Sequence, residues 1–226
     1  MSNERRLVVI AIDGPAGAGK STIAKRLALR LGFTYIDTGA MYRAVALWAS
    51  RQSVDPADMH RMEQLALAAA IELEPGGSSV LLNGEDVSEE IRRPEIAEAA
   101  SMAAAIPAVR RALVEKQRAM GASGSVVIEG RDIGSVVFPE ASVKIFLDAD
   151  PDERVRRRLA ETASARETVA GQLKERDDRD RTRAESPLVQ APDAVYIDST
   201  SLSEEEVEEA ILKVIRTKLS NGKGFE

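Results

Sequence analysis

The chain has 226 residues, of which 44% are hydrophobic and 30% charged, so it is long enough to bury a full hydrophobic core. It has no cysteine and one histidine, His60, which excludes disulfides, thiolate metal sites and cysteine nucleophiles. The net charge of −6 argues against general affinity for nucleic acid or an anionic membrane, so polyanions would have to bind at local arginine clusters.

The first apolar run, Leu7 to Ile12, ends at Asp13 and is too short for a signal peptide or a membrane span. We therefore expect a cytoplasmic protein with no nucleic-acid or membrane partner. A monomer is the default expectation.

Short β-rich runs alternate with longer helical patterns along most of the chain. The runs are "RLVVIAI", "FTYID", "SVVIEG", "VKIFLDA" and "AVYID", and the helical patterns include residues 21–31, 38–52 and 203–219. This alternation predicts an α/β fold, in which helices cover both faces of a parallel five-stranded sheet.

The alternation breaks between about residues 58 and 93. There "IELEPGGSSVLLNGEDVS" predicts antiparallel strands, with the Asn83-Gly84 pair as a strong hairpin signal. This segment is interpreted as an inserted lobe. The Ala-rich stretch that follows predicts two helices divided at Pro107.

Residues 14–22, "GPAGAGKST", match the phosphate-loop pattern G-x-x-x-x-G-K-[ST] between a strand and a helix. In such a loop the backbone N–H groups surround phosphate oxygens, so the sequence predicts a nucleoside triphosphate site. Lys20 would neutralise β/γ charge, and Ser21 would ligate Mg²⁺. The predicted ATP-binding residues are Gly14, Pro15, Ala16, Gly17, Ala18, Gly19, Lys20, Ser21 and Thr22. No guanine-reading [NT]-K-x-D element occurs, which argues against a GTPase switch.

Arginines also follow two later strands, as an acceptor site for phosphoryl transfer would require. In "YIDTGAMYR", Thr38 is placed to cap a helix that carries Arg43, although a simple cap and a surface arginine would give the same pattern. In "EGRDIG", Arg131 and Asp132 lie beyond the carboxyl end of a strand, where open sheets bind ligands; the alternative is a buried salt bridge. Arg110 could equally be a solvated helix residue.

The stretch 175–183, "ERDDRDRTR", places Arg176, Asp180 and Arg183 on one face if it is helical, with Asp177 and Asp178 elsewhere. It is either a solvated helix with i,i+4 ion pairs or an anion site held open by carboxylates.

Nearly end to end, the sequence resembles the bacterial cytidylate kinase family of nucleoside monophosphate kinases. The resemblance rests on "GPAGAGKST", "DTGAMYR", "LNGEDVS", "EGRDIGSVVFPEASVKIFLDA", "ERDDRDRTR" and the late "DST". Two positions depart from the family pattern. Glu129 stands where aspartate is more usual, and Ser21-Thr22 stands where related kinases often have Gly-Thr.

The resemblance implies one P-loop NTPase domain over residues 1–226, with a core of 5–57 and 94–220. The inserted lobe of about 58–93 would bind the nucleoside monophosphate, and about 152–170 would form a short lid. The implied reaction is Mg²⁺-dependent transfer of the ATP γ-phosphoryl group to CMP or dCMP, giving CDP or dCDP and ADP.

The resemblance also implies a set of monophosphate-site residues: Thr38, Arg43, Ser101, Arg110, Arg131, Asp132, Arg176, Asp180 and Arg183. Asp132 and Ser101 would accept from the cytosine amino group, and Arg110 would donate to N3 and O2. Lys20, Arg131, Arg154 and Arg158 would be catalytic, although the segment with Arg154 and Arg158 could be a merely solvated basic helix.

Three rival functions stay open. One is a P-loop kinase for another small acceptor, such as UMP, AMP or a non-nucleotide metabolite. The second is a non-catalytic nucleotide-binding regulatory protein, and the third is nucleic-acid binding through the arginines, which the acidic net charge disfavours.

Overall fold

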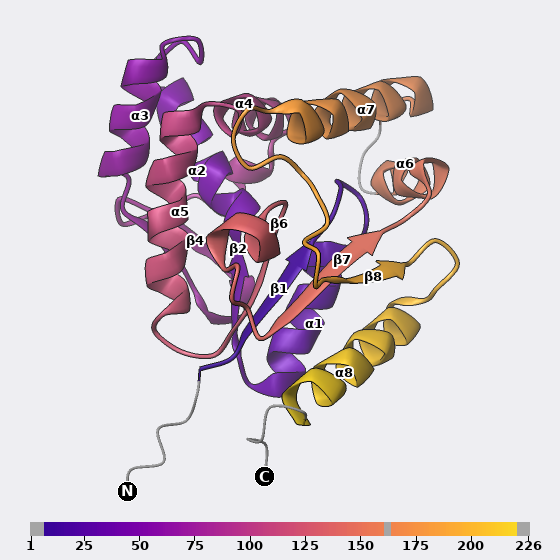
Figure 1. Cartoon of the computed structure of the whole chain (residues 1–226). Helices are drawn as coiled ribbons and strands as arrows, with labels where there is room; N and C mark the ends of the chain where they lie inside the picture. The colour runs from indigo at the N-terminus through magenta and orange to yellow at the C-terminus, as the bar shows by residue number, and fades with distance from the viewer. Residues whose placement is uncertain (1–6, 161–163, 221–226) are drawn as a thin grey trace, which may run out of the picture.

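Five parallel strands form the central sheet in the order β2-β6-β1-β7-β8 (Figure 1). The computed structural model describes residues 7–160 and 164–220. The strands are β1 (Val9–Asp13), β2 (Thr34–Asp37), β6 (Val126–Gly130), β7 (Val143–Asp148) and β8 (Val195–Asp198). All five lie within or overlap the predicted β-rich runs, so the predicted parallel sheet is confirmed.

Helices cover both faces of this sheet, as predicted (Figure 1). Ile10 and Ile12 of β1 pack in one buried cluster with α1 (Lys20–Leu31) and α8 (Glu204–Ser220). Ala11, between them, belongs to a second cluster with α5 (Pro107–Gly121) on the opposite face. Strand side chains alternate in direction, and a strand that is buried on both sides reads as a continuous apolar run.

The segment 71–86 forms a small antiparallel sheet of β3 (Ile71–Leu73), β4 (Val80–Leu82) and β5 (Glu85–Asp86). Asn83 and Gly84 connect β4 to β5, both with positive φ, of 52° and 84°. The predicted hairpin is therefore confirmed, because two successive residues with positive φ match the twist of a tight hairpin.

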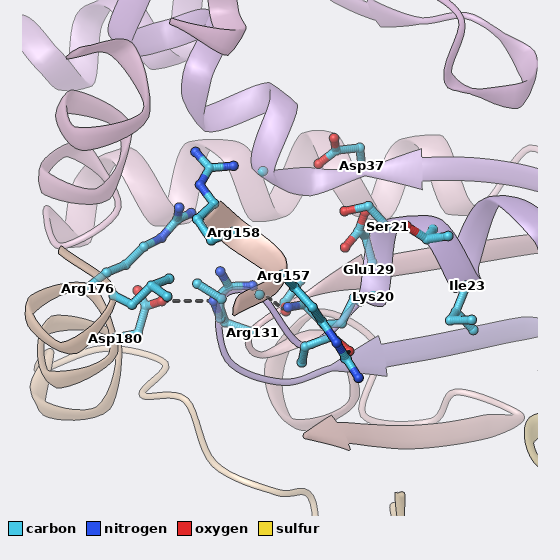
Figure 2. A pocket seen from close by; sticks show the side chains of 18 of the residues that line it. Lys20, Ser21, Ile23, Asp37, Glu129, Arg131, Arg157, Arg158, Arg176 and Asp180 are labelled. Atoms are coloured by element: carbon cyan, nitrogen blue, oxygen red, sulfur yellow. Dashed lines mark hydrogen bonds and ion pairs between the residues drawn. The ribbon is translucent and has the colours of Figure 1, made fainter. Parts of the chain in front are cut away.

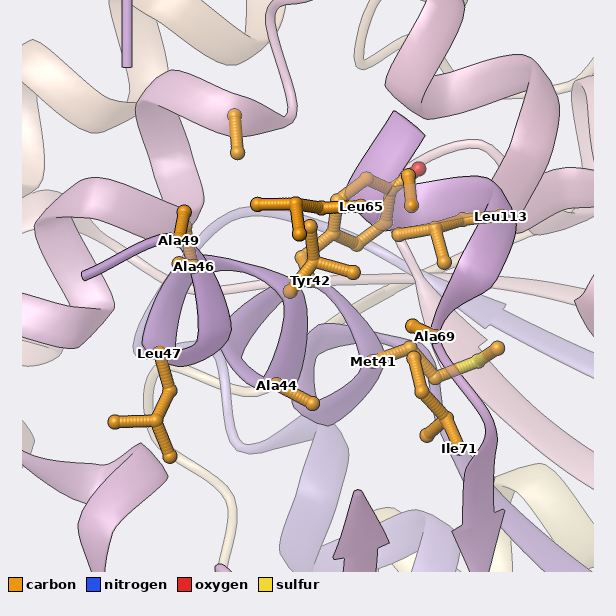
Figure 3. Close-up of a cluster of buried hydrophobic side chains, with 14 of the residues drawn as sticks. Met41, Tyr42, Ala44, Ala46, Leu47, Ala49, Leu65, Ala69, Ile71 and Leu113 are labelled. Atoms are coloured by element: carbon orange, nitrogen blue, oxygen red, sulfur yellow. The ribbon is translucent and has the colours of Figure 1, made fainter. Parts of the chain in front are cut away.

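The small sheet shares its core with several helices: α2 (Thr38–Arg51), α3 (Met59–Ala68), α4 (Pro94–Ala103) and α5. Figure 3 shows part of this cluster, in which Met41 and Tyr42 of α2 lie near Leu65, Ile71 and Leu113. The division of α4 from α5 before Pro107 is as predicted. The lobe boundaries near residues 58 and 93 stay a prediction, since the cluster extends beyond both.

Two further helices, α6 (Pro151–Leu159) and α7 (Arg166–Thr182), cover most of the predicted lid and the charged stretch. Residues 161–163 of that lid lie outside the described residues, as do residues 5–6 of the predicted core. Short helical turns occur at η1 (Pro75–Gly77), η2 (Glu90–Arg92) and η3 (Ile133–Val137). Within 7–160 and 164–220, none of the helices has the length and apolar character needed to cross a bilayer.

Candidate active site

A cavity of about 680 Å³ opens at the carboxyl edge of the sheet. It is the expected place for a ligand in an open α/β sheet. The loop after β1 and the start of α1 line one side. Residues of α2, α4, α5, the end of β6, α6, α7 and the segment from Ser199 into α8 also line the cavity. Figure 2 shows Lys20 and Ser21 in this cavity together with Arg131, Arg158 and Arg176.

The loop of residues 14–19 has the backbone that its glycines predict. Gly14 has a φ of 148°, and a Cβ there would lie 1.9 Å from the carbonyl oxygen of Leu147. The loop therefore packs against β7 so closely that no side chain fits at this position. The Lys20 Nζ donates to the carbonyl oxygen of Pro15 at 2.6 Å, which holds the ammonium group over the loop.

Burial, and then the positive charge of Arg131, lower the pKa of Lys20 to about 7. A bound phosphate would reverse this effect, because an anion beside the ammonium group favours its charged form. A polyphosphate bound beside Lys20 would therefore restore the full positive charge of this group.

Oxygen atoms suited to Mg²⁺ lie beside the start of α1. Figure 2 shows Ser21, Asp37 and Glu129 grouped at this point. Glu129 is buried and accepts from the Tyr35 hydroxyl at 2.5 Å; burial, and then the charge of Asp37, raise its pKa. No cluster of three or more His, Cys, Asp or Glu that could hold a metal occurs in the described part of the chain. A hydroxyl and one or two carboxylates still fit Mg²⁺, which usually keeps waters and shares its other ligands with substrate phosphates.

Asp37, and not the predicted Thr38, caps α2. The Asp37 carboxylate accepts from the backbone N–H of Ala40 at 2.9 Å and pairs with Arg43 at 2.9 Å. Thr38 instead donates from its hydroxyl to the carbonyl oxygen of Glu129 at 2.7 Å. The capping prediction was wrong because the strand ends at Asp37, and aspartate is at least as good a cap as threonine.

A buried group of charges lies where the base of an acceptor nucleotide is expected. Arg110 pairs with Asp132 at 2.5 Å, and Arg183 lies 3.6 Å from the other Asp132 oxygen. The guanidinium of Arg110 also donates to the carbonyl oxygen of Ala104 at 3.2 Å and lies 5.5 Å from the ring centre of Tyr42. The alternative of a solvated Arg110 is excluded, since only 3% of its side chain is exposed.

The acceptor wall, defined as the arginines and carboxylates that line the cavity opposite the phosphate loop, continues with Arg131 and Asp180. The Nε of Arg131 donates to the Oδ2 of Asp180 at 2.8 Å (Figure 2). Asp180 also contacts Arg183 at 3.3 Å. Burial opposes the negative charge of Asp180, but Arg131 and Arg176 outweigh it and lower the pKa of this carboxyl. Burial and the nearby charge of Arg131 lower the pKa of Arg176 to about 10. Excess positive charge is therefore concentrated at this wall.

Several arginines of the wall keep a buried N–H group without a hydrogen-bond partner. These atoms are Nε of Arg43, Arg110 and Arg176, and Nη2 of Arg183. Buried donors are nearly always paired in proteins, and all four of these arginines line the cavity. The stretch 175–183 is thus not merely a solvated helix.

Ser101 has a partner that the sequence did not suggest. Arg179 donates to the Ser101 hydroxyl at 2.6 Å and to Glu98 at 2.8 Å, which joins α7 to α4. The hydroxyl keeps a second lone pair and its own proton for a ligand.

The two predicted lid arginines differ in position. Arg158 lines the cavity, but Arg154 does not: its side chain is buried against Asp177 and the carbonyl oxygen of Ala16. Arg157, which was not predicted, lines the cavity and donates to the hydroxyl and the carbonyl oxygen of Ser199 at 3.0 and 2.6 Å. Helical spacing alone did not show which arginine faces the cavity and which is buried behind the phosphate loop.

Asp13 is another residue that the sequence analysis missed. Its carboxylate accepts from the backbone N–H groups of Ile133 and Gly134, both at 2.7 Å, and so fixes the turn after Arg131 and Asp132. Burial raises its pKa to about 6, although these two bonds favour the charged form. In the sequence, the only indication of this role is that Asp13 ends an otherwise apolar strand.

Comparisons with known proteins agree with this geometry. A family model described as cytidylate kinase matches residues 10–217. The chain is 64% identical to a cytidylate kinase of Solibacter usitatus, over 98% of each chain. It is 51% identical to a cytidylate kinase of Pelotomaculum thermopropionicum, over 95% of this chain and 96% of that one. A crystal structure of an uncharacterized protein from Eubacterium ventriosum shares the fold, with a TM-score of 0.55 at 14% identity, over 94% of this chain and 99% of that one.

Proposed function

The chain belongs to the cytidylate kinase family of nucleoside monophosphate kinases, and from this premise we propose how its cavity phosphorylates CMP and dCMP. ATP would bind at residues 14–22, and its γ-phosphoryl group would pass to the phosphate of CMP or dCMP. The products would be ADP and CDP or dCDP.

The observation that carries this proposal is the pairing of two anion sites in one cavity. The phosphate loop lines one part of the cavity, and Arg43, Arg131 and Arg176 line another. A protein that only bound a nucleotide as a switch would not need the second site. Two facing anion sites instead suit transfer between two phosphates.

No general base is needed for this reaction. The attacking atom is a phosphate oxygen of CMP, which is largely ionised at neutral pH because its second pKa is about 6. Catalysis then consists of aligning two anions that repel each other and offsetting their charge. Lys20 would serve the donor phosphates, while Arg43, Arg131 and Arg176 would serve the acceptor phosphate.

The buried charges around Asp132 suit cytosine. Asp132 and Ser101 would accept from the amino group at C4, and Arg110 would donate to N3 and O2. Uracil reverses this pattern at N3 and C4 and would leave buried groups unpaired, and such mismatches can discriminate by roughly 10⁴. Asp180 would accept from the sugar hydroxyls, with Arg183 beside it.

Mg²⁺ would be held by the Ser21 hydroxyl with Asp37 and Glu129 nearby, and would neutralise charge on the donor phosphates when bound. Ser21 is preferred to Thr22 because Ser21 is grouped with these two carboxylates (Figure 2). Arg158 would approach the transferred group from the lid, and closure of the lid would exclude water. A cytoplasmic monomer that binds no nucleic acid or membrane completes the proposal.

The test is Mg²⁺-dependent formation of ADP from ATP with CMP, dCMP, UMP, AMP or no acceptor. We expect strong turnover with CMP and dCMP, little with UMP, and almost none without an acceptor. Turnover with a different acceptor would overturn the roles of Ser101, Arg110 and Asp132 but keep the kinase mechanism. Absence of transfer to every acceptor would overturn the proposal.

A further inference from the structure

Arg154 and Asp177 form a buried ion pair behind the phosphate loop. Arg154 belongs to α6 and Asp177 to α7, and the Nη1 to Oδ2 distance is 2.6 Å. Only 7% and 4% of the two side chains are exposed. Neither residue lines the cavity, so neither touches the substrates directly.

The remaining contacts of Arg154 are with the donor side. Its Nη1 also donates to the carbonyl oxygen of Ala16 at 3.1 Å, and its Nε donates to the carbonyl oxygen of Ala149 at 3.1 Å. A Cβ on Gly17 would lie 3.1 Å from the Arg154 Cβ, so α6 packs closely on the loop. One guanidinium thus joins the phosphate loop, the segment after β7 and α7.

Asp177 lies on the helix that carries the acceptor wall. Its neighbour Arg176 lines the cavity, and Asp180, one turn further along α7, bonds to Arg131 at 2.8 Å. A shift of Asp177 relative to the phosphate loop would therefore move Arg176 and Asp180 relative to the donor phosphates.

We propose that Arg154 and Asp177 act as a positioning pair that fixes the distance between the donor loop and the acceptor helix. The inference rests on the proposed phosphoryl transfer and explains how the donor and acceptor phosphate sites are kept at a fixed distance from each other. Direct transfer needs the reacting atoms about 3 to 3.5 Å apart, and a misplacement of about 1 Å can lower the rate roughly 100-fold.

Stability alone is a poor explanation of this pair. A buried ion pair is often no more stabilising than apolar side chains of similar volume. In addition, the second carboxylate oxygen, Asp177 Oδ1, is buried without a hydrogen-bond partner. The specific contact with the loop carbonyl is what apolar side chains could not supply.

The decisive variant is the double substitution Arg154→Met and Asp177→Leu, because it removes the pair without leaving a buried charge unpaired. We would measure Tm, the stoichiometry and Kd of CMP binding by calorimetry, and CDP and ADP formation. We expect a Tm close to native, one CMP bound per chain, and Kd and both KM values within threefold of native. We expect kcat for CDP to fall at least tenfold, with more ADP than CDP formed because water intercepts the misplaced phosphoryl group.

Asp178→Asn is the matched control, because Asp178 is exposed on the same helix and pairs only with Lys174 at 2.7 Å among the contacts described. It should keep native kcat. Native kcat in the double variant, or a loss that follows a lowered Tm and substoichiometric CMP binding, would overturn the positioning role. CDP formation by the native protein in the same assay tests the kinase function itself, so the two failures are distinguishable.

Discussion

The donor side of the cavity is lined mainly by one continuous stretch, residues 16–23, whereas the acceptor side combines side chains from α2, α4, α5, β6 and α7. In the proposed function the donor side would bind phosphates mainly through backbone N–H groups, which need glycines and a particular loop shape. The acceptor side depends on long side chains such as Arg110 and Arg131, which are held in place by carboxylates. A contiguous loop can be found in the sequence alone, but a wall of this kind depends on the fold to bring its parts together.

The largest effect should come from removing the one side-chain charge of the donor side. Lys20→Met should lower kcat about 1000-fold, because it removes a preorganised cation from the phosphates that react. Affinity for CMP, measured by calorimetry, should stay within threefold of native. A parallel loss of CMP affinity would show that the two sides are not separable.

Asp132→Asn should have the next largest effect, and on the acceptor side. It leaves Arg110 buried without its ionic partner, so kcat/KM for CMP should fall about 100-fold. The preference for CMP over UMP should fall with it, while KM for ATP stays unchanged. Steady-state kinetics with both acceptors would measure this, and an unchanged preference would contradict the assignment of Asp132 to the base.

Asp180→Ala should raise KM for CMP about tenfold, because it removes a charge-assisted bond to Arg131. Asp178→Ala on the same helix should change it less than twofold. Asp177 also lies off the predicted face by helical spacing, but it is unsuitable as a control because it is buried against Arg154. Equal effects at positions 180 and 178 would reject the assignment of the helix face.

The smallest expected effect is the uptake of a fraction of a proton by Lys20 when ATP binds. With a pKa of about 7, this group is mostly neutral at pH 7.5, and bound phosphates should charge it. Binding of Mg²⁺-ATP at pH 7.5 should therefore take up roughly 0.8 proton, and ATP affinity should fall as the pH rises above about 7. Calorimetry in buffers of different ionisation enthalpy measures the uptake, which should vanish at pH 5.5. No uptake at pH 7.5 would contradict the lowered pKa.

The difference between a contiguous loop and a wall assembled from distant segments explains which features could be predicted from the sequence. The five strands, the hairpin at Asn83-Gly84 and the break before Pro107 follow from local patterns, and the structure confirms them. The phosphate loop follows from its spacing. The pairing of Arg110 with Asp132 could not be read from spacing, because the two residues are joined only when α5 packs beside the end of β6.

Side-chain direction was the least predictable property. Arg154 and Arg158 share a helix face by spacing, yet one is buried behind the loop and the other lines the cavity. The buried position of Arg154 depends on α7, which supplies Asp177 as its partner. Likewise, the roles of Arg157 and Arg179 depend on Ser199 and Ser101, which lie far away in the sequence.

The strand order has a consequence for how the protein is made. The phosphate loop follows β1, which pairs with β6 on one side and with β7 on the other. A ribosome must therefore synthesise the chain as far as Asp148 before β1 has both neighbours and Leu147 can pack against Gly14. Because such distant pairings form late, the nascent chain carries a complete nucleotide-loop sequence long before it can bind a nucleotide. Cellular ATP can thus stabilise this protein only after most of its synthesis is finished.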